Sequence, residues 1–477
     1  MSKLSFPIDP VLTGQARLTE AQALELHAKA SLHDLGQWAH AVTQRLHPQD
    51  TRTYVIDRNI NYTNVCTAKC TFCAFRRDHE DTDSYTLSYD TIGEKIRELV
   101  SIGGTQILMQ GGMNDALPIE WYEDLLRYIR STFPTVHIHA FSPPEFVEFE
   151  RFFNLDVRDV IRRFKAAGLH TIPGGGGEIF GNRVRRRIGI GKCSGDDWLR
   201  VMRVAHEEGM NTSCTMLIGH IEFVRERIEH MASLRDMQDY ALSLGSRGSE
   251  VGGRRAESRH PGVFEKSPYT PHDPQPTTYG AYTAFIHWPF QRENTPLGRA
   301  KEWVEATYGA FDESTNDDIL RGRVVRMAGA EEYLRMLAIA RLFFDNIPNL
   351  QSSWVTMGPK IGQLALMFGA NDMGSVMMEE NVVSAAGTTY KLEAREICRL
   401  IRDAGWIPAQ RDQYYNILHR HDGPDSPDLQ PPAHPAMRNV AKIDSSFIGR
   451  APGMEPVFAS RADDAVRVQL PILGDAR

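Results

Sequence analysis

From residue 54 onward, short runs rich in β-branched and aromatic residues alternate with longer amphipathic stretches. The candidate strands lie at residues 54–56, 106–109, 135–140, 171–172, 212–218, 283–286 and 351–353. The candidate helices include residues 91–102, 121–132, 157–167, 195–208 and 223–240. Repeated strand–helix alternation is typical of parallel β/α units. About 360 residues of it suffice for a closed barrel, so the sequence predicts an α/β fold of the (β/α)8, TIM type over residues 51–416.

Three segments depart from this alternation. Residues 1–50 carry apolar side chains at helical spacing, which predicts an N-terminal helical extension. Residues from about 241 to 280 are rich in Ser, Gly, Pro and Arg, as expected of a surface loop inserted into the barrel. Residues 417–477 include a Pro- and Asp-rich stretch, which predicts a flexible C-terminal tail.

Bulk composition narrows the class of protein. The 477 residues carry a formal net charge of −7, which argues against a nucleic-acid scaffold. No apolar run approaches the roughly 20 residues needed to cross a bilayer, and residues 1–7 lack the features of a secretory signal. Six cysteines are too few and too unevenly spread for a disulfide framework. We therefore expect a cytoplasmic protein without nucleic-acid or membrane partners.

Three of the cysteines lie within eight residues. Cys66, Cys70 and Cys73 form a CxxxCxxC motif directly after the first candidate strand. Thiolates at this spacing can wrap a loop around one [4Fe–4S] cluster and leave one iron without a protein ligand. The amino and carboxylate groups of S-adenosylmethionine (SAM) can chelate such an open iron. The motif thus predicts a radical SAM site at the C-terminal mouth of the barrel.

Two other interpretations of the cysteines stay open at this point. A zinc ion would need a fourth ligand, and His79 is near enough in the sequence to supply it. A cluster that only transfers electrons would normally have a fourth thiolate. With such a cluster, the protein would be a non-catalytic redox sensor or electron carrier and not an enzyme.

Glycine-rich turns after later strands are candidates for holding SAM. Gln110, Gly111 and Gly112 follow the second strand, and four glycines before Glu178 follow the fourth. A plain connection is the alternative for each run, and the four-glycine run is the more unusual of the two, because the Glu178 carboxylate would suit ribose hydroxyls. Gly219, after the fifth strand, would present its backbone to adenine.

Other candidate side chains have structural alternatives. Glu222 would contact SAM or stabilise the first turn of a helix, and His220 would face the mouth or be a core imidazole. Ser142 would touch SAM or cap a helix, together with Glu145. His137 and His139 alternate along the third strand and therefore share a face.

Several stretches together resemble the dehypoxanthine futalosine cyclase family, also called cyclic dehypoxanthinyl futalosine synthases, of the futalosine route to menaquinone. The matching runs are residues 57–66, 103–106 with 110–112, 169–178, 216–222, 288–291 with 293–298, 353–355 and 379–383. The resemblance covers residues 54–414 apart from the insertion. It implies [4Fe–4S] and SAM as cofactors, and it adds Phe72, inside the cysteine motif, to the expected SAM-binding residues.

The resemblance also implies a reaction. An adenosyl radical removes the C4′ hydrogen of dehypoxanthine futalosine, the sugar radical closes a ring onto the benzoate, and a base removes a proton. Candidate partners for the benzoate carboxylate are Arg58, Arg77, Thr295 and Ser353, while the base is unassigned and His220 is a weak candidate. An electron donor such as flavodoxin or ferredoxin is implied as the protein partner.

Three positions depart from the family pattern. Arg76 stands where Tyr is expected, Arg292 replaces Pro, and Val376 replaces Thr. Arg76 and Arg292 would lie near the site and so bear on substrate identity. Aminofutalosine synthase, or another radical SAM enzyme acting on an aromatic or purine-linked substrate, is therefore the alternative within the superfamily.

Overall fold

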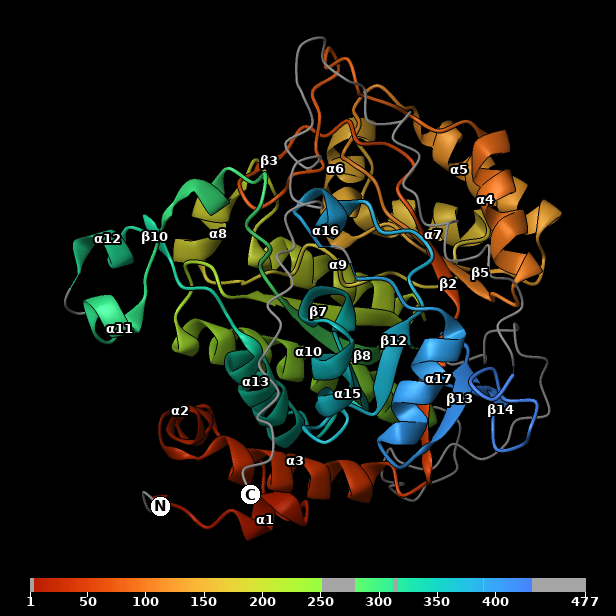
Figure 1. Cartoon of the computed structure of the whole chain (residues 1–477). Coiled ribbons are helices and arrows are strands. Elements are labelled where there is room, and N and C mark those ends of the chain that lie inside the picture. Colours follow the sequence, from red (N-terminus) through yellow and green to blue (C-terminus); the bar gives the residue numbers. More distant parts are fainter. Residues whose placement is uncertain (1–3, 251–278, 312–315, 389, 431–477) are drawn as a thin grey trace, which may run out of the picture.

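The fold is seen in a computed structural model, which describes residues 4–250, 279–311, 316–388 and 390–430. Eight parallel strands form a closed ring. Figure 1 shows strands at the centre of the molecule, with helices around them. The first barrel strand is made of two consecutive segments, β1 and β2. The ring continues through β4, β5, the residue pair 171–172, β7, β8, β11 and β12. Residues 171–172 form the fourth strand of the ring. The labelled segments are β1 (Thr51–Val55), β2 (Asp57–Ile60), β4 (Gln106–Met109), β5 (His137–Ala140), β7 (Thr212–Ile218), β8 (Tyr282–Pro289), β11 (Asn349–Gln351) and β12 (Asp372–Ser375).

The register shows how the ring closes. Parallel bridges join His139 to Thr171 and Ile172 to Thr212, so the shortest strand still connects β5 to β7. The last strand returns to the first through the parallel pair Thr53–Asp372. This closure confirms the predicted (β/α)8 architecture, including a fourth strand of only two residues.

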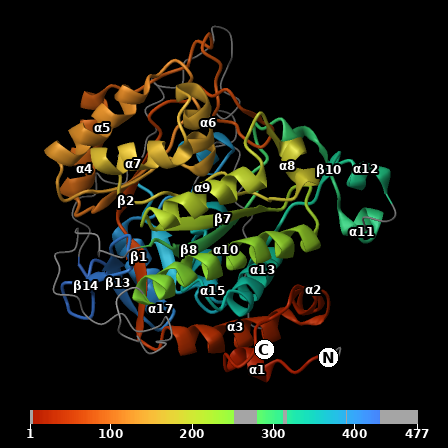
Figure 2. The same ribbon diagram turned by 180° about the vertical axis from the view of Figure 1, so that it is seen from behind.

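Helices cover the outside of the ring, and Figure 2 shows α9 and α10 running alongside β7. Their starts follow local sequence, since Ser88 and Ser194 accept hydrogen bonds from backbone amides of the first turns. The larger ones are α4 (Tyr89–Ser101), α5 (Ile119–Thr132), α6 (Pro143–Phe153), α7 (Val157–Ala167), α9 (Gly195–Glu207), α10 (Val224–Glu250), α13 (Ala330–Phe343) and α17 (Ala394–Asp403). Four of the five predicted helices thus begin and end within two residues of their expected bounds, whereas α10 runs ten residues past its expected end at residue 240.

Short elements occupy the connections. They are α8 (Asn182–Ile188), η1 (Leu297–Arg299), α11 (Glu305–Tyr308), α12 (Asp317–Leu320), α14 (Trp354–Met357), α15 (Pro359–Ala365) and α16 (Val382–Ala385). The short strands are β3 (Lys69–Cys70), β6 (Gly189–Ile190), β9 (Lys301–Glu302) and β10 (Val324–Val325). Two of these, β3 and β6, pair with each other next to the cysteine motif.

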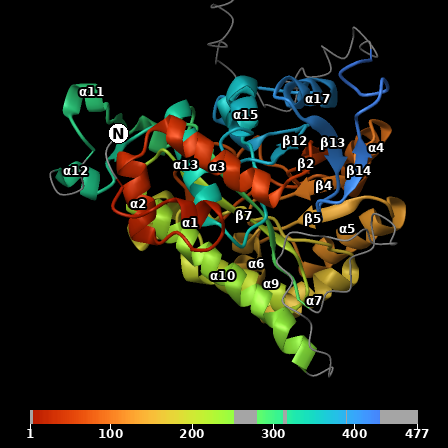
Figure 3. The same cartoon turned by 90° about the horizontal axis from the view of Figure 1, so that it is seen from below.

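The N-terminal extension is helical, as predicted. It consists of α1 (Asp9–Leu12), α2 (Glu20–Lys29) and α3 (Leu32–Leu46). A capping box between Thr19 and Gln22 begins α2, and Ser31 caps α3. Figure 3 shows α3 lying beside α13, where Leu35 and Ala39 are fully buried. The extension therefore packs on the barrel through an apolar face of α3.

Two predicted boundaries need correction. Helix α10 continues to Glu250, past the expected start of the insertion near residue 241, while residues 251–278 lie outside the described residues. Strand β14 (Ile417–Arg420) pairs antiparallel with β13 (Ile407–Arg411), so the start of the predicted tail belongs to the sheet. The Tyr54 hydroxyl also lies 2.9 Å from Nε2 of His421. Residues 431–477, the rest of that tail, are likewise outside the described residues.

The end of β13 places a cation inside the barrel. Arg411 makes a two-pronged contact with Asp372 of β12, from Nε to Oδ2 at 2.6 Å and from Nη2 to Oδ1 at 2.9 Å. Both residues are almost fully buried, at 1% and 0% side-chain exposure. Because a buried charge without its partner carries a large desolvation cost, this pair joins the C-terminal segment to the barrel wall.

His137 and His139 face the same interior. Both rings lie within hydrogen-bond distance of the Thr171 hydroxyl, at 2.8 and 2.7 Å. The ring of Tyr414 packs edge-on against His137. Burial lowers the pKa of His139 to about 3, so this imidazole is neutral near pH 7. The two histidines, which the sequence places on one face of this strand, therefore form hydrogen-bonded contacts inside the barrel.

Replacing Arg411 by Met should lower the free energy of unfolding by about 3–5 kcal/mol, because the buried Asp372 carboxyl would lose its ion-pair partner. Urea unfolding of the cluster-loaded protein, followed anaerobically by circular dichroism, measures the change. Arg420→Met is the matched control, since Arg420 pairs with Asp50 at the surface, and it should cost at most about 1 kcal/mol. Equal losses in the two variants would contradict the assignment of Arg411 as a buried anchor.

Candidate active site

The cysteine loop leaves the C-terminal end of the first barrel strand. Cys66, Cys70 and Cys73 are all partly exposed. The loop is fixed by backbone pairing, because Cys70 lies opposite Gly189 in the β3–β6 ladder and the Thr71 amide donates to Ile188 O at 2.8 Å. These backbone contacts hold the cysteine loop at the C-terminal mouth of the barrel, where the sequence predicts it.

The chemistry of these three thiols fits a metal cluster. Burial raises the pKa of Cys66 and raises that of Cys70 to about 12, so the metal-free thiols hold their protons at neutral pH. Iron binding must displace those protons, which couples cluster assembly to pH. The remaining three cysteines, Cys193, Cys214 and Cys398, are buried in other elements.

Two basic residues near the motif have other partners. His79, the fourth ligand of the zinc interpretation, is about half exposed, and its Nε2 lies 2.7 Å from Asp115 Oδ1. Arg77 donates from Nη1 to the carbonyl oxygens of Ala74 and Arg76, at 3.1 and 2.9 Å. The predicted benzoate partner Arg77 therefore braces the cysteine loop.

The turn after β4 touches the cysteine loop. A Cβ on Gly112 would lie 2.0 Å from the Val65 carbonyl oxygen, so only glycine allows this approach. The Gly111 amide donates to Glu145 Oε1 at 3.2 Å, and the Gln110 carbonyl accepts from Asn61 at 3.0 Å. Gln110, Gly111 and Gly112 are thus placed beside the cluster motif, where SAM is expected.

Ser142 and Glu145 form a capping box at the start of α6. The Ser142 hydroxyl donates to Glu145 Oε2 at 2.6 Å, and Tyr62 donates to the other carboxylate oxygen at 2.7 Å. Burial raises the pKa of Glu145. The structure therefore shows the capping role that was the alternative to SAM contact for both residues.

The four-glycine run is held from behind by Arg185 on α8. This buried guanidinium donates to the carbonyl oxygens of Gly176 and Gly177, each at 3.0 Å. A Cβ on Gly175 would lie 2.3 Å from Gln110 Nε2, so the run also abuts the turn after β4. The glycines therefore permit close packing between two mouth segments.

Glu178 ends that run and faces the cysteine loop. Its Oε1 lies 2.8 Å from Lys192 Nζ, and the Lys192 ammonium lies 5.3 Å from the centroid of the Phe72 ring. The backbone of Glu178 is left-handed, with φ of 35°. Non-glycine residues adopt this conformation at a cost, and such residues concentrate at functional sites. Phe72, Lys192 and Glu178 thus form one layer beside Cys70.

The predicted residues after β7 form a closed network of their own. Glu222 Oε1 accepts from the Gly219 amide at 2.6 Å and from Arg227 Nη2 at 2.7 Å. Its Oε2 accepts from the His220 amide at 2.9 Å. Burial opposes ionisation of Glu222, but the charges of His220 and Arg227 hold its pKa well below the usual range. Glu222 and His220 therefore shape the turn, and the backbone of Gly219, with φ of 82°, makes it possible.

The remaining substrate candidates are dispersed. Arg58 donates to Glu379 at 2.8 Å and to the Lys95 carbonyl at 2.9 Å, on the side of β2 that faces α4. Thr295 is buried within its own turn, where its hydroxyl donates to Arg292 O at 2.8 Å. Ser353 lies just beyond β11, with its hydroxyl 2.8 Å from Thr356 Oγ1. Arg58 and Thr295 are thus engaged in structural contacts, while Ser353 stays a candidate at the mouth.

Sequence reasoning missed Lys192 and Arg185, which brace the mouth through long-range contacts. Neither residue lies in a spacing pattern that would single it out. The contact between Asn59 and Glu380, 2.9 Å from Nδ2 to Oε2, was signalled only by the family-like run at residues 379–383. On the same strand, burial raises the pKa of Asp57 to about 6.

A closed (β/α)8 barrel with three loop thiols and glycine turns at its C-terminal mouth defines the class of radical SAM enzymes. A model of the radical SAM superfamily matches residues 60–234, and a model of the CofH/MqnC C-terminal region matches residues 307–422. The chain thus uses a [4Fe–4S] cluster and SAM and acts on a small molecule. This assignment excludes the zinc and electron-carrier interpretations of the motif.

Curated relatives define the family further. Cyclic dehypoxanthine futalosine synthase of Halalkalibacterium halodurans is 38% identical over 84% of this chain and 92% of its own length. The Streptomyces coelicolor enzyme of the same name is 37% identical over 87% and 90%. A 5-amino-6-(D-ribitylamino)uracil–L-tyrosine 4-hydroxyphenyl transferase of Methanopyrus kandleri is 35% identical over 76% and 83%. The chain belongs to the radical SAM family of the cyclic dehypoxanthine futalosine synthases.

Solved structures support the fold alone. Methylornithine synthase has a TM-score of 0.55 at 16% identity, covering 84% of this chain and 97% of that one. The FeFe-hydrogenase maturase HydG of Carboxydothermus hydrogenoformans has a TM-score of 0.56 at 13% identity, with coverages of 86% and 79%. In the described ranges of this chain, no helix combines the length and apolar character that crossing a bilayer requires.

Replacing Cys70 by Ser should abolish cluster binding and SAM cleavage while the barrel stays folded, because one of three cluster ligands is lost. Iron analysis, visible absorption and circular dichroism of anaerobically reconstituted protein check this. Cys398→Ala, on α17 away from the mouth, is the control and should retain iron. Normal iron content in the Cys70 variant would refute the ligand assignment.

Proposed function

We propose that this enzyme converts dehypoxanthine futalosine into cyclic dehypoxanthine futalosine on the futalosine route to menaquinone. The main support for this proposal is the 38% sequence identity to a synthase of that name, over 84% of this chain and 92% of that one. Aminodeoxyfutalosine synthase of Thermus thermophilus is 32% identical over 87% of this chain, which supports the alternative less strongly.

The cluster, when bound, supplies the electron that cleaves SAM into methionine and a 5′-deoxyadenosyl radical. Cys66, Cys70 and Cys73 are the residues that would hold it. We assign the backbone of Gly111 and Gly112 to the methionine end of SAM, because this turn adjoins the cysteine loop. Glu178 is assigned to the ribose and the backbone of Gly219 to adenine. Phe72 and Gln110 would line the same space, and Ser142 and Glu222 support it from behind.

The proposed conversion balances as the loss of two hydrogens from the substrate. The adenosyl radical takes the C4′ hydrogen atom and becomes 5′-deoxyadenosine. The C4′ radical forms a carbon–carbon bond to the benzoate ring. A base then receives one proton, and a one-electron acceptor receives one electron. The protein must hold C4′ against the radical carbon, because positioning supplies much of the rate.

A segment after β12 supports exclusion of water from this site. Glu379 bonds to Arg58 and to Lys95 Nζ at 2.8 Å, and Asn381 donates to Asn61 Oδ1 at 3.2 Å. These contacts hold the segment against the first barrel strand. Such coverage suits a radical that water and stray hydrogen donors would quench. Ser353 is our remaining candidate for the benzoate carboxylate, and the base is unassigned.

Three statements stay predictions from the sequence. They are a flavodoxin or ferredoxin as electron donor, a cytoplasmic location, and the lack of nucleic-acid or membrane partners. The donor matters most for function, because SAM cleavage consumes one electron each time it occurs.

The test is an anaerobic assay of reconstituted, reduced protein with SAM and dehypoxanthine futalosine. We expect free 5′-deoxyadenosine and a product two hydrogens lighter than the substrate by mass spectrometry. Formation of 5′-deoxyadenosine without any change in the mass of dehypoxanthine futalosine would favour the alternative, another radical SAM activity such as that of an aminofutalosine synthase. Unchanged SAM in the presence of an intact cluster would contradict both activities.

Glu178→Gln should raise the Kd for SAM about tenfold or more, since a hydrogen bond to a charged group contributes about 1.5–3 kcal/mol. Isothermal calorimetry on the anaerobic, cluster-loaded protein measures it. Glu120→Gln, a surface change on α5, serves as the control and should leave the Kd unchanged. The same Kd in both variants would remove Glu178 from the SAM site.

A further inference from the structure

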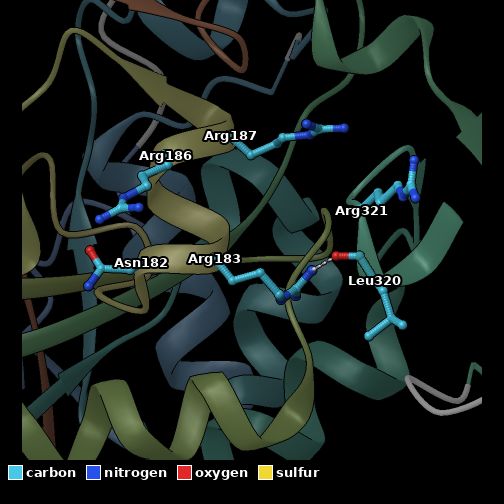
Figure 4. A pocket seen from close by; sticks show the side chains of 6 residues that line it. All are labelled: Asn182, Arg183, Arg186, Arg187, Leu320 and Arg321. Carbon is cyan, nitrogen blue, oxygen red and sulfur yellow. Dashed lines mark hydrogen bonds between the residues drawn. The ribbon is translucent and has the colours of Figure 1, made fainter. Parts of the chain in front are cut away.

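A basic hollow of about 350 Å³ lies between α8, whose C-terminal end contacts the cysteine loop, and the end of α12. Figure 4 shows Arg183, Arg186 and Arg187 projecting from α8, and Arg321 from the segment after α12. Asn182 and Leu320 complete its lining. Four arginines on one surface stand out on a chain whose net charge is −7. A local field of this sign attracts an acidic partner.

Two of these arginines form ion pairs with carboxylates of the same chain. Arg183 makes ion pairs with Glu226, including 2.6 Å from Nη2 to Oε2, and Arg321 lies 2.9 Å from Asp317. Arg186 and Arg187 are exposed and have no ion-pair partner within the part of the chain that the structure describes. The unbalanced positive charge of the surface therefore comes from this neighbouring pair.

The same pair is joined directly to the cluster loop. The Arg187 carbonyl is 3.5 Å from the Thr71 hydroxyl, and the Ile188 carbonyl accepts from the Thr71 amide at 2.8 Å. Thr71 immediately follows Cys70, which lies opposite Gly189 in the β3–β6 ladder. A molecule seated on Arg186 and Arg187 would thus be separated from the cluster by one short layer of protein.

We infer that this surface docks an acidic electron-transfer protein that reduces the cluster. This inference rests on the proposed function, because a radical SAM reaction needs one electron for each SAM cleaved. In the step, the donor protein is oxidised by one electron and the cluster is reduced by one. The rate of electron transfer falls steeply as the distance between the two redox centres grows. A donor that docks next to Cys70 would bring its redox centre close to the cluster.

The geometry favours a protein over a small anion. A phosphate-sized ligand needs several donors that converge on one point. Here the Arg183 guanidinium is occupied by Glu226 and donates to the Ile221 carbonyl at 2.6 Å. The free charges of Arg186 and Arg187 lie exposed on the helix, where they suit the broad acidic face of a protein.

The test compares two reductants on the cluster-loaded enzyme. In Arg186→Glu/Arg187→Glu, we expect dithionite-driven formation of 5′-deoxyadenosine to stay within twofold of wild type. With reduced flavodoxin at low salt, kcat/KM for flavodoxin should fall at least tenfold, and the difference should shrink as ionic strength rises. Arg186→Gln/Arg187→Gln should give a smaller loss in the same direction.

The matched control is Arg97→Glu/Arg399→Glu. These exposed arginines lie on α4 and α17, away from α8, and likewise have no ion-pair partner among the described residues (Figure 1). This variant carries the same change of net charge and should keep the wild-type rate with flavodoxin. Iron content and circular dichroism establish that all variants are folded and loaded.

Equal flavodoxin kinetics in the α8 and control variants would overturn the docking assignment. A loss of the dithionite-driven rate would also overturn it, because the surface would then serve a small anionic ligand or the fold. Failure of wild-type enzyme to cleave SAM with either reductant is a separate outcome that contradicts the proposed function itself.

Discussion

The site depends on how the backbone of the cysteine loop is fixed. A free loop of eight residues would sample many arrangements of its thiols, and ordering them would have to be driven by the metal. In this chain the short β3–β6 ladder and the Thr71–Ile188 hydrogen bond fix one side of the loop, and Arg77 fixes the other through backbone carbonyls. The cluster therefore assembles on a scaffold that the barrel has already positioned.

That scaffold extends behind the mouth as buried ionic contacts. Arg185 holds the carbonyls of the glycine run, Lys192 pairs with Glu178, and Arg227 pairs with Glu222. In each case a charged side chain from one element fixes a turn that follows a barrel strand. Such contacts are costly unless every charge is satisfied, which explains why they are short and well partnered. In the proposed site, the backbones of Gly111, Gly112 and Gly219 would contact SAM at turns that follow barrel strands.

Local patterns in the sequence predicted the parts of this architecture that depend on local physics. Strand–helix alternation predicted the barrel, and Cys66, Cys70 and Cys73 predicted the class of chemistry. Both signals depend only on residues that are close together in the sequence. The boundaries at residues 241 and 417 were wrong, since polar composition hid the end of α10 and the pairing of β14. For Ser142 and Glu222 the sequence left SAM contact and a structural role open, whereas the bracing roles of Arg77, Lys192 and Arg185 escaped prediction. Arg77 bonds to carbonyls one and three residues before it, while Arg185 and Lys192 bond to residues 8 to 14 positions away, and none of these separations forms a pattern that the sequence alone would reveal.

The proposed chemistry requires an iron that three cysteines leave open for SAM. The decisive measurement is electron paramagnetic resonance of the anaerobically reduced protein, recorded with and without SAM. We expect a [4Fe–4S] signal whose g-values shift when SAM binds, because the cosubstrate ligates the cluster. A cluster signal that SAM leaves unchanged, or a protein that takes up zinc in place of iron, would contradict the proposed chemistry.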